Sequence, residues 1–157
     1  MRSSVIVAAE GVLITDTWKV IETGKHFIQS LSSVYRVTVA LNHNEVDRFK
    51  LWLQMENVSG VDEVLPSATP MSYRGVDERI AQVEMMSRRG YDLAFLVDSD
   101  PERVAGCLAQ GYDAIMFCSA KFQRPEFRPD YDSSVKSWDS LVQEMEMQAY
   151  LRSQVDN

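Results

Sequence analysis

The chain has 157 residues, of which 45% are hydrophobic and 25% are charged. This length and composition indicate one soluble globular domain with a hydrophobic core, and they exclude a disordered or membrane-spanning chain. Sixteen basic residues against twenty-three acidic ones give a net charge of −7, which opposes binding to the phosphate backbone of nucleic acids. We therefore expect no nucleic-acid partner.

The sequence contains no apolar run of the length that a membrane-spanning helix needs. We interpret the apolar stretch after Arg2 as the first strand rather than a signal peptide, because Glu10 interrupts it. The two cysteines, Cys107 and Cys118, lie in predicted apolar elements and lack the spacing of a redox or metal motif. We expect two buried free thiols and a cytoplasmic protein without a membrane segment.

Short apolar segments alternate along the chain with stretches of helical periodicity. Three consecutive β-branched residues, Val5 to Val7, indicate a strand that is covered on both faces, as in a parallel sheet. The periodicity predicts strands at about 5–8, 35–41, 62–65, 92–97 and 113–117, and helices at about 16–31, 44–56, 76–89, 101–110 and 134–152.

Polar residues and prolines mark the expected helix starts. Asp16 and Asn44 are each followed by an apolar stripe with helical spacing, so both are predicted N-caps. Asp100 precedes Pro101, and proline is favoured at the first position of a helix. The stretch 66–75 contains two prolines and a glycine and is predicted to be a loop.

The regular alternation of strand and helix predicts an α/β fold with a mainly parallel five-stranded sheet. We expect one domain, 1–157, with its core at about 4–118, an aromatic loop at 119–133 and a C-terminal helix at about 134–152. In such sheets ligands bind outside the carboxyl ends of the strands. The first strand ends at Ala8, Ala9 and Glu10, so we place the candidate site there.

Three segments of the sequence resemble motifs of the haloacid dehalogenase (HAD) superfamily. The stretch Val5 to Leu13 resembles its first motif, an apolar strand followed by Asp-x-Asp-Gly-Thr/Val-Leu. The stretch Phe95 to Glu102 resembles its fourth motif, an apolar strand that ends in clustered acids, and Gly111 to Phe117 is similar to its last core strand. The resemblance implies a three-layer, Rossmann-like HAD core. The short segment between Leu13 and Thr17 leaves no room for a cap domain.

A further likeness lies nearer the C-terminus. The Arg-Pro-x-x-Arg-Pro pattern at 124–129, with the later Trp-Asp-x-Leu at 138–141, is similar to small HAD-like proteins encoded by actinobacterial phages. This likeness implies a phage origin for the chain.

Enzymes of the superfamily use the first aspartate of the first motif as a nucleophile and the second as a general acid and base. By the match, Ala8 stands at the nucleophile position and Glu10 at that of the general acid and base. Alanine has no oxygen, so an aspartyl-phosphate cannot form there. Glu10 and Asp98 are therefore expected to be remnants of catalytic residues.

The resemblance also assigns ligands to this edge. Glu10, Asp98 and Asp100 are the residues that would hold Mg²⁺, weakly because Ala8 supplies no carboxylate. For Asp98 and Asp100 we keep open a purely structural role in the turn and at the start of the next helix.

The remaining candidates are ligand-binding residues near the same edge. No lysine matches the superfamily's phosphate-holding lysine, and Arg74 or Arg79 is the candidate to supply its charge. Asn42 and His43 follow the second strand, and Asn42 is able to donate to an oxyanion. Gly11 completes the expected set of ligand-binding residues, which are Gly11, Asn42, His43 and Arg74.

These residues predict a catalytically degenerate HAD-like protein that binds a protein partner or a small phosphorylated ligand. One alternative is a metal-dependent phosphohydrolase in which Glu10, Asp98 and Asp100 place Mg²⁺ and activate a water. A second alternative is a homodimerisation or host-target module that uses the C-terminal helix, where Met145 and Met147 offer adaptable contacts.

Overall fold

The computed structural model describes residues 2–67, 76–120, 122 and 138–155. Within these residues the chain forms a five-stranded sheet of order β3-β2-β1-β4-β5, in which neighbouring strands are parallel. The strands are β1 (Ser4–Ala8), β2 (Arg36–Ala40), β3 (Glu63–Leu65), β4 (Leu93–Asp98) and β5 (Ala114–Met116).

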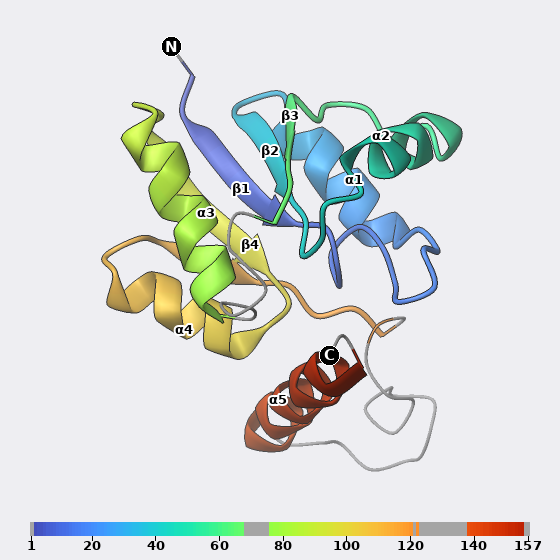
Figure 1. Ribbon diagram of the computed structural model, residues 1–157, viewed down its shortest axis with the longest axis vertical. Helices are drawn as coiled ribbons and strands as arrows, with labels where there is room; N and C mark the ends of the chain where they lie inside the picture. The colour runs from blue at the N-terminus through green and yellow to red at the C-terminus, as the bar shows by residue number, and fades with distance from the viewer. Residues whose placement is uncertain (1, 68–75, 121, 123–137, 156–157) are drawn as a thin grey trace.

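Helices lie on both faces of this sheet (Figure 1). On these faces lie α1 (Glu22–Leu31), α2 (Val46–Met55), α3 (Val76–Arg88) and α4 (Pro101–Ala109). Helix α5 (Trp138–Val155) lies beyond the end of the sheet, next to α4 (Figure 1). Val5 and Val7 of β1 share a core cluster with residues of α1 and α2, whereas Ile6 lies in a second cluster with residues of α3 and α4. Side chains alternate across a strand, so β1 is buried on both faces. The predicted three-layer α/β class is confirmed.

The segment between β1 and α1 differs from the prediction. The first helix begins at Glu22 and not at Asp16. Residues 9–21 instead fold into tight turns, in which Ile14 pairs with Glu10 and with Val20 as isolated β-bridges. Asp16 is therefore not an N-cap, because the backbone around it is already held by the turn. As predicted, no cap domain is inserted in this connection.

The helix starts at α2 and α4 contrast with each other. Helix α2 begins at Val46, and the imidazole Nδ1 of His43 accepts a hydrogen bond from the Glu45 backbone N–H. The predicted cap at Asn44 is thus wrong. At α4 the carboxylate of Asp100 accepts from the backbone N–H of Glu102 at 2.9 Å, and Pro101 occupies the first turn as predicted.

The cysteines match the prediction only in part. Both are free thiols, and Cys107 is buried, but Cys118 is exposed. Strand β5 ends at Met116, so Cys118 lies beyond the sheet although the apolar pattern of the sequence continues to it. Burial of Cys107 raises the pKa of its thiol to about 11, so the thiol stays protonated near neutral pH.

Several predicted features lie outside the described residues. These are most of the loop predicted at 66–75, including Arg74, and most of the aromatic loop predicted at 119–133, including the Arg-Pro-x-x-Arg-Pro pattern. Among the residues that the structure describes, none of the helices combines the length and the apolar character that crossing a membrane requires.

Candidate functional site

The candidate site lies where the strand order reverses, between β1 and β4. Strands β2 and β3 extend to one side of β1, and β4 lies on its other side. Ala8 ends β1, Ala40 ends β2 opposite it, and Asp98 ends β4, so these residues share the carboxyl edge of the sheet. Ligands of doubly wound α/β folds bind at this switch point. Ala8 is fully buried, so a methyl group stands at the tip of the central strand.

Arg79 of α3 is the cation at the centre of this edge. Its side chain is fully buried, and its Nε donates to Oδ2 of Asp98 at 3.0 Å. Its Nη1 donates to Oε1 of Gln82 at 2.6 Å, and its Nη2 donates to Oδ1 of Asn42 at 2.7 Å. The guanidinium therefore links α3 to the ends of β2 and β4.

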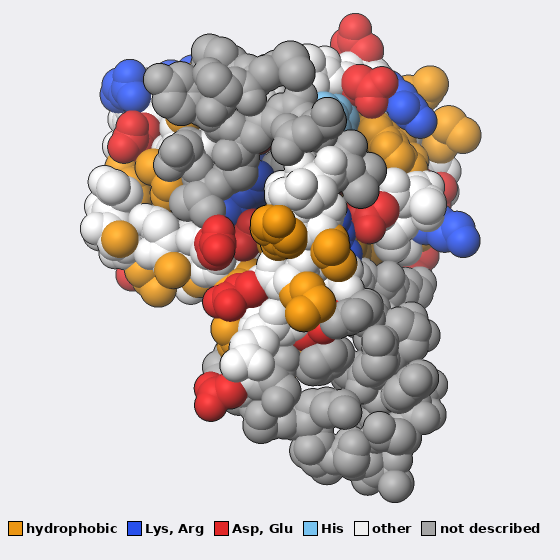
Figure 2. All heavy atoms as spheres, turned by 60° about the horizontal axis from the view of Figure 1, so that its bottom comes forward, with side chains coloured by type: hydrophobic (Ala, Val, Ile, Leu, Met, Phe, Trp, Pro, Cys, Tyr) orange, Lys and Arg blue, Asp and Glu red, His pale blue; other side chains and the backbone are white. Residues whose placement is uncertain are grey.

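A second arginine approaches from α4. Nη1 of Arg103 donates to the same Oδ1 of Asn42 at 2.9 Å. Because both partners of this atom are donors, it is the amide oxygen of Asn42. Arg103 also lies 3.8 Å from Oδ2 of Asp100 and 3.9 Å from Oε2 of Glu78. Figure 2, which brings this end of the molecule forward, shows acidic side chains beside recessed basic ones.

Glu10 and His43 face each other at the same edge of the sheet. Nε2 of His43 lies 3.6 Å from Oε1 of Glu10, and their side chains are 30% and 21% exposed. Nδ1 of His43 accepts from the Glu45 N–H, so a neutral imidazole carries its proton on Nε2. Within the described part of the chain, Oε2 of Glu10 and Nε2 of His43 are buried atoms without a hydrogen-bond partner.

Burial is the main influence on the acids of this site. It raises the pKa of Glu10, against the opposing effects of Arg79, a backbone hydrogen bond, His43 and Arg103. Burial also raises the pKa of Asp100, which Arg103 opposes. Both carboxyl groups therefore hold a proton to higher pH than they would in water.

Asp98 and Asp100 each serve the turn between β4 and α4. Oδ1 of Asp98 accepts from the backbone N–H of Asp100 at 3.0 Å, while its Oδ2 is bound by Arg79. Oδ1 of Asp100 caps α4. The structural role that the sequence left open for both residues is thus present.

Gly11 is needed for close packing in the turn after β1. Its φ is +83°, a conformation that favours glycine, and an added Cβ would overlap the hydroxyl of Ser99 and meet the ring of Phe122. The Ser99 hydroxyl donates to the carbonyl oxygen of Glu10 at 3.2 Å. The part of Gly11 in ligand binding stays a prediction.

The described residues do not fit a divalent cation at this edge. They contain no cluster of three or more His, Cys, Asp or Glu side chains arranged to hold a metal ion. Ala8 supplies no oxygen, both oxygens of Asp98 already accept hydrogen bonds, and a buried guanidinium stands beside them. Glu10, Asp98 and Asp100 lie at the same end of the sheet, but Arg79 is paired with Asp98 and Arg103 lies beside Asp100.

The structure also brings into the site residues that the sequence pattern did not single out. The sequence offers Arg79 only as an alternative to Arg74 for the charge of the missing lysine, and it assigns no role to Gln82 or Arg103. Arg79 and Gln82 are three residues apart on α3, which places them on one helix face, and this spacing was readable in the sequence. Arg103 follows the cap residue Asp100 by three positions, which is a further usable signal.

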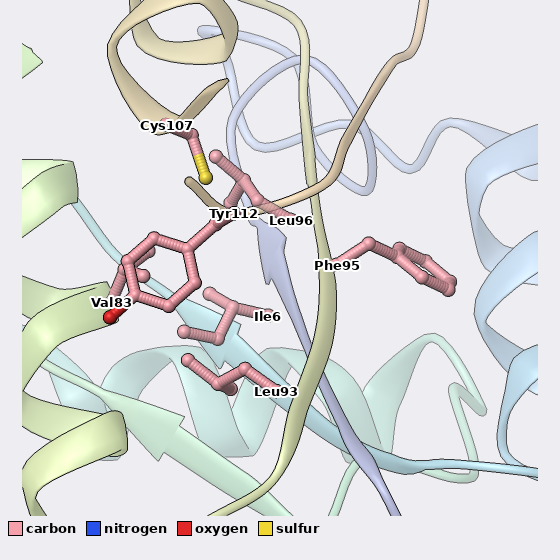
Figure 3. Close-up of a pocket in the computed structure, with 7 residues that line it drawn as sticks. All are labelled: Ile6, Val83, Leu93, Phe95, Leu96, Cys107 and Tyr112. Atoms are coloured by element: carbon pink, nitrogen blue, oxygen red, sulfur yellow. The ribbon is translucent and has the colours of Figure 1, made fainter. Parts of the chain in front are cut away.

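A small apolar cavity lies away from this edge, between the sheet and α3 and α4 (Figure 3). Its volume is about 10 Å³, enough for about one water and too small for a substrate. Figure 3 shows Phe95 pointing away from the other lining side chains. The lining residues are Ile6, Val83, Leu93, Phe95, Leu96, Cys107 and Tyr112. The cavity is therefore a packing defect of the core.

No protein-family model and no curated protein matches the chain. Solved structures do match it. A chain of the Pnkp1/Rnl/Hen1 RNA repair complex superposes with a TM-score of 0.60 at 13% identity, over 78% of this chain and 44% of the other. The present chain thus spans less than half the length of that protein.

Two further structures match at nearly full length of their own chains. The HAD domain of the effector protein Lem4 from Legionella pneumophila, an inactive mutant, has a TM-score of 0.51 at 12% identity and covers 97% of this chain and 98% of its own. A predicted HAD-like family hydrolase from Porphyromonas gingivalis has a TM-score of 0.50 at 14% identity, over 74% and 91%. The parallel sheet, its strand order and these likenesses show that the chain has the HAD-like fold.

Proposed function

We propose that this protein is a catalytically degenerate HAD-like protein that binds a protein partner or a small phosphorylated ligand at the carboxyl edge of its sheet. The observation that carries the proposal is Ala8, a buried methyl group at the tip of the central strand. Covalent phosphoryl transfer needs an oxygen nucleophile at that point. Loss of a covalent nucleophile costs about 10⁶-fold in rate in other enzymes.

The groups around Ala8 support recognition rather than turnover. Arg79 and Arg103 bring two positive charges to the edge, and Asn42 holds both. Glu10 and His43 add two buried polar atoms without partners in the described part of the chain. A phosphate group or polar side chains of a partner would find both donors and acceptors here.

The structural likeness to a chain of an RNA repair complex, whose components are proteins, is a reason to consider a protein partner. The two free cysteines support a cytoplasmic location, where thiols stay reduced. The likeness of residues 124–129 to phage-encoded proteins supports a phage origin.

Turnover of a general phosphatase substrate tests the proposal. We expect the purified protein to hydrolyse p-nitrophenyl phosphate no faster than Asp98→Asn, with or without Mg²⁺. Metal-dependent hydrolysis that Asp98→Asn or Glu10→Gln abolishes would refute the proposal, and it would establish the phosphohydrolase alternative, in which Glu10, Asp98 and Asp100 activate a water.

The binding half of the proposal has its own measurement. Inorganic phosphate is titrated into the labelled protein while the backbone amide resonances of Asn42, Glu10 and their neighbours are followed. A phosphorylated ligand predicts shifts confined to this edge that weaken in Arg103→Met. If phosphate leaves these resonances unchanged, the proposal of a phosphorylated ligand is wrong, and a protein partner is the remaining proposal.

Exposed apolar residues on α5 favour the second candidate function, self-association. Met147, Tyr150 and Leu151 are 48%, 63% and 46% exposed. Sedimentation velocity is expected to show a concentration-dependent dimer that Tyr150→Glu weakens, whereas Leu51→Glu on the exposed face of α2 leaves it unchanged. A strict monomer at all concentrations would rule this candidate out.

A further inference from the structure

Each carboxylate that the HAD resemblance assigns to Mg²⁺ has a guanidinium group acting on it. Asp98 is bound by Arg79 at 3.0 Å, and Asp100 lies 3.8 Å from Nε of Arg103. Arg79 is also the strongest of the influences that lower the pKa of Glu10. Positive charge from the chain itself therefore already stands beside the carboxylates that a divalent cation would use.

Arg79 is held in place from several directions. Its side chain is fully buried, and Asp98, Gln82 and Asn42 each accept one of its N–H groups. Gln82 is itself fixed, because its amide nitrogen donates to the carbonyls of Leu41 and Pro66 at 2.9 and 2.8 Å. The guanidinium cannot move aside without breaking this network. An arginine also keeps its proton at any ordinary pH.

A divalent cation and this guanidinium would compete for the same oxygens. Oδ2 of Asp98 accepts from Arg79, and its Oδ1 accepts from the backbone of Asp100. Two cations in contact with one carboxylate repel each other, and burial strengthens that repulsion relative to water. Mg²⁺ also gives up its waters reluctantly and seeks free oxygen ligands.

We propose that Arg79 is a built-in cation that takes the place of the divalent metal: it balances the charge of Asp98 and prevents Mg²⁺ from binding while it is present. The inference rests on the proposed function, since it concerns the same edge, and deepens it by making ligand binding there independent of metal. Such a site is expected to bind its ligand equally well in the presence and absence of a metal chelator.

Removal of the charge is the direct test. Arg79→Met keeps an unbranched apolar side chain in place of the arginine stem but leaves Asp98 buried without a counter-charge, so the melting temperature is expected to fall by roughly 10 °C. MgCl₂ is then expected to raise it by about 5 °C, because a bound ion stabilises the folded state. The melting temperature of the wild type is expected to be unchanged by MgCl₂ relative to KCl of equal ionic strength.

Two matched variants separate charge from packing. Arg79→Lys retains a cation and is expected to show no response to MgCl₂. Arg79→Met with Asp98→Asn removes both partners, so it is expected to be more stable than Arg79→Met alone and to lose the response. Calorimetric titration of the wild type with MgCl₂ is expected to show no saturable heat.

The possible outcomes decide the inference separately from the proposed function. Saturable Mg²⁺ binding by the wild type overturns it, as does a folded Arg79→Met that Mg²⁺ does not stabilise. If Arg79→Met does not fold, Arg79→Lys decides: stabilisation by Mg²⁺ overturns the inference, and indifference supports it. Magnesium binding without turnover would overturn this inference alone, whereas hydrolysis of phosphate esters in EDTA would overturn the proposed function alone.

Discussion

Glu10 illustrates at the scale of one residue how burial and neighbouring charges oppose each other. Its carboxyl group is mostly buried, and burial outweighs the attraction of Arg79, so its pKa lies above the ordinary value of 4.5. The folded state thus holds this proton more tightly than the unfolded state does. As pH rises from below 4.5 through the raised pKa, this group's contribution to stability is lost.

The variant Glu10→Gln tests the direction of this pH dependence of stability. Glutamine cannot ionise, so the stability of the variant relative to the wild type is expected to increase as pH rises through this range and then to level off. Urea unfolding from about pH 4 to pH 8 measures the difference. The raised pKa of Asp100 affects the stability of both proteins equally, so its effect cancels in the difference.

Glu146→Gln, at an exposed position of α5, is the control and is expected to follow the wild type at every pH. An advantage of Glu10→Gln that shrinks with rising pH would contradict the assignment.

At the scale of elements, helix α2 anchors the turn-rich segment 9–21 beside the site. The indole Nε1 of Trp52 donates to the carbonyl of Trp18 at 2.9 Å, and Trp18 has a φ of +61° in this turn. The ring of Trp18 lies 5.5 Å from that of His43 and 6.1 Å from that of Phe49. The position of His43 therefore depends on the packing of a helix that carries no site residue.

Phe49→Ala is the corresponding prediction. Phe49 is fully buried and stacks on Trp52, so its removal is expected to cost about 3–5 kcal/mol of unfolding free energy. Leu51 on the same helix is 56% exposed, and Leu51→Ala is expected to change stability by no more than about 0.5 kcal/mol. Denaturant unfolding of both variants checks the contrast. Equal costs would mean that α2 does not pack on the sheet through this face.

At the scale of the whole molecule, Arg152 connects the C-terminal helix to the start of the chain. Its Nε donates to both carboxylate oxygens of Asp16 at 3.1 Å, across 136 positions of sequence. Its Nη2 donates to the carbonyl of Phe122, and its guanidinium lies 3.5 Å from the centre of the Phe122 ring. The ring of Phe122 in turn lies against Gly11, so α5 is tied to the turn next to Glu10.

Arg152→Ala is expected to lower the unfolding free energy by about 1–2 kcal/mol, because an ion pair, a hydrogen bond and a cation–π contact are lost together. Arg88→Ala is the control, since Arg88 is 78% exposed and makes a surface pair with Glu84, worth about 0.5 kcal/mol or less. Urea unfolding compares the two. Faster amide exchange in α5 of Arg152→Ala, but not of Arg88→Ala, is expected as well, and unchanged exchange would show that α5 is held elsewhere.

Local patterns in the sequence were enough to predict the fold. The β-branched run of β1, the helical spacing in α3 and the Asp100–Pro101 start of α4 depend on neighbours only a few residues away, so strand and helix could be read in order. The absence of an oxygen at Ala8 is likewise a property of one residue. Asp16 shows where such local patterns fail. Aspartate is a favoured N-cap residue, but the residues after β1 pair with one another in turns, and helix α1 begins only at Glu22.

The pairings within the site were decided only by the tertiary structure. Arg79 and Asp98 lie 19 positions apart, and Arg79 and Asn42 lie 37 apart, so no short-range pattern links them. Helical spacing shows that Arg79 and Gln82 share a face, but which face turns inward depends on the apolar residues of the sheet against which the helix packs. The sequence by itself therefore determined the layers of the fold, the buried central strand β1 and the absence of a nucleophile at Ala8. The packing of α3 on the sheet decided that a buried cation stands beside Asp98, because burying that carboxylate is favourable only with a counter-charge in contact.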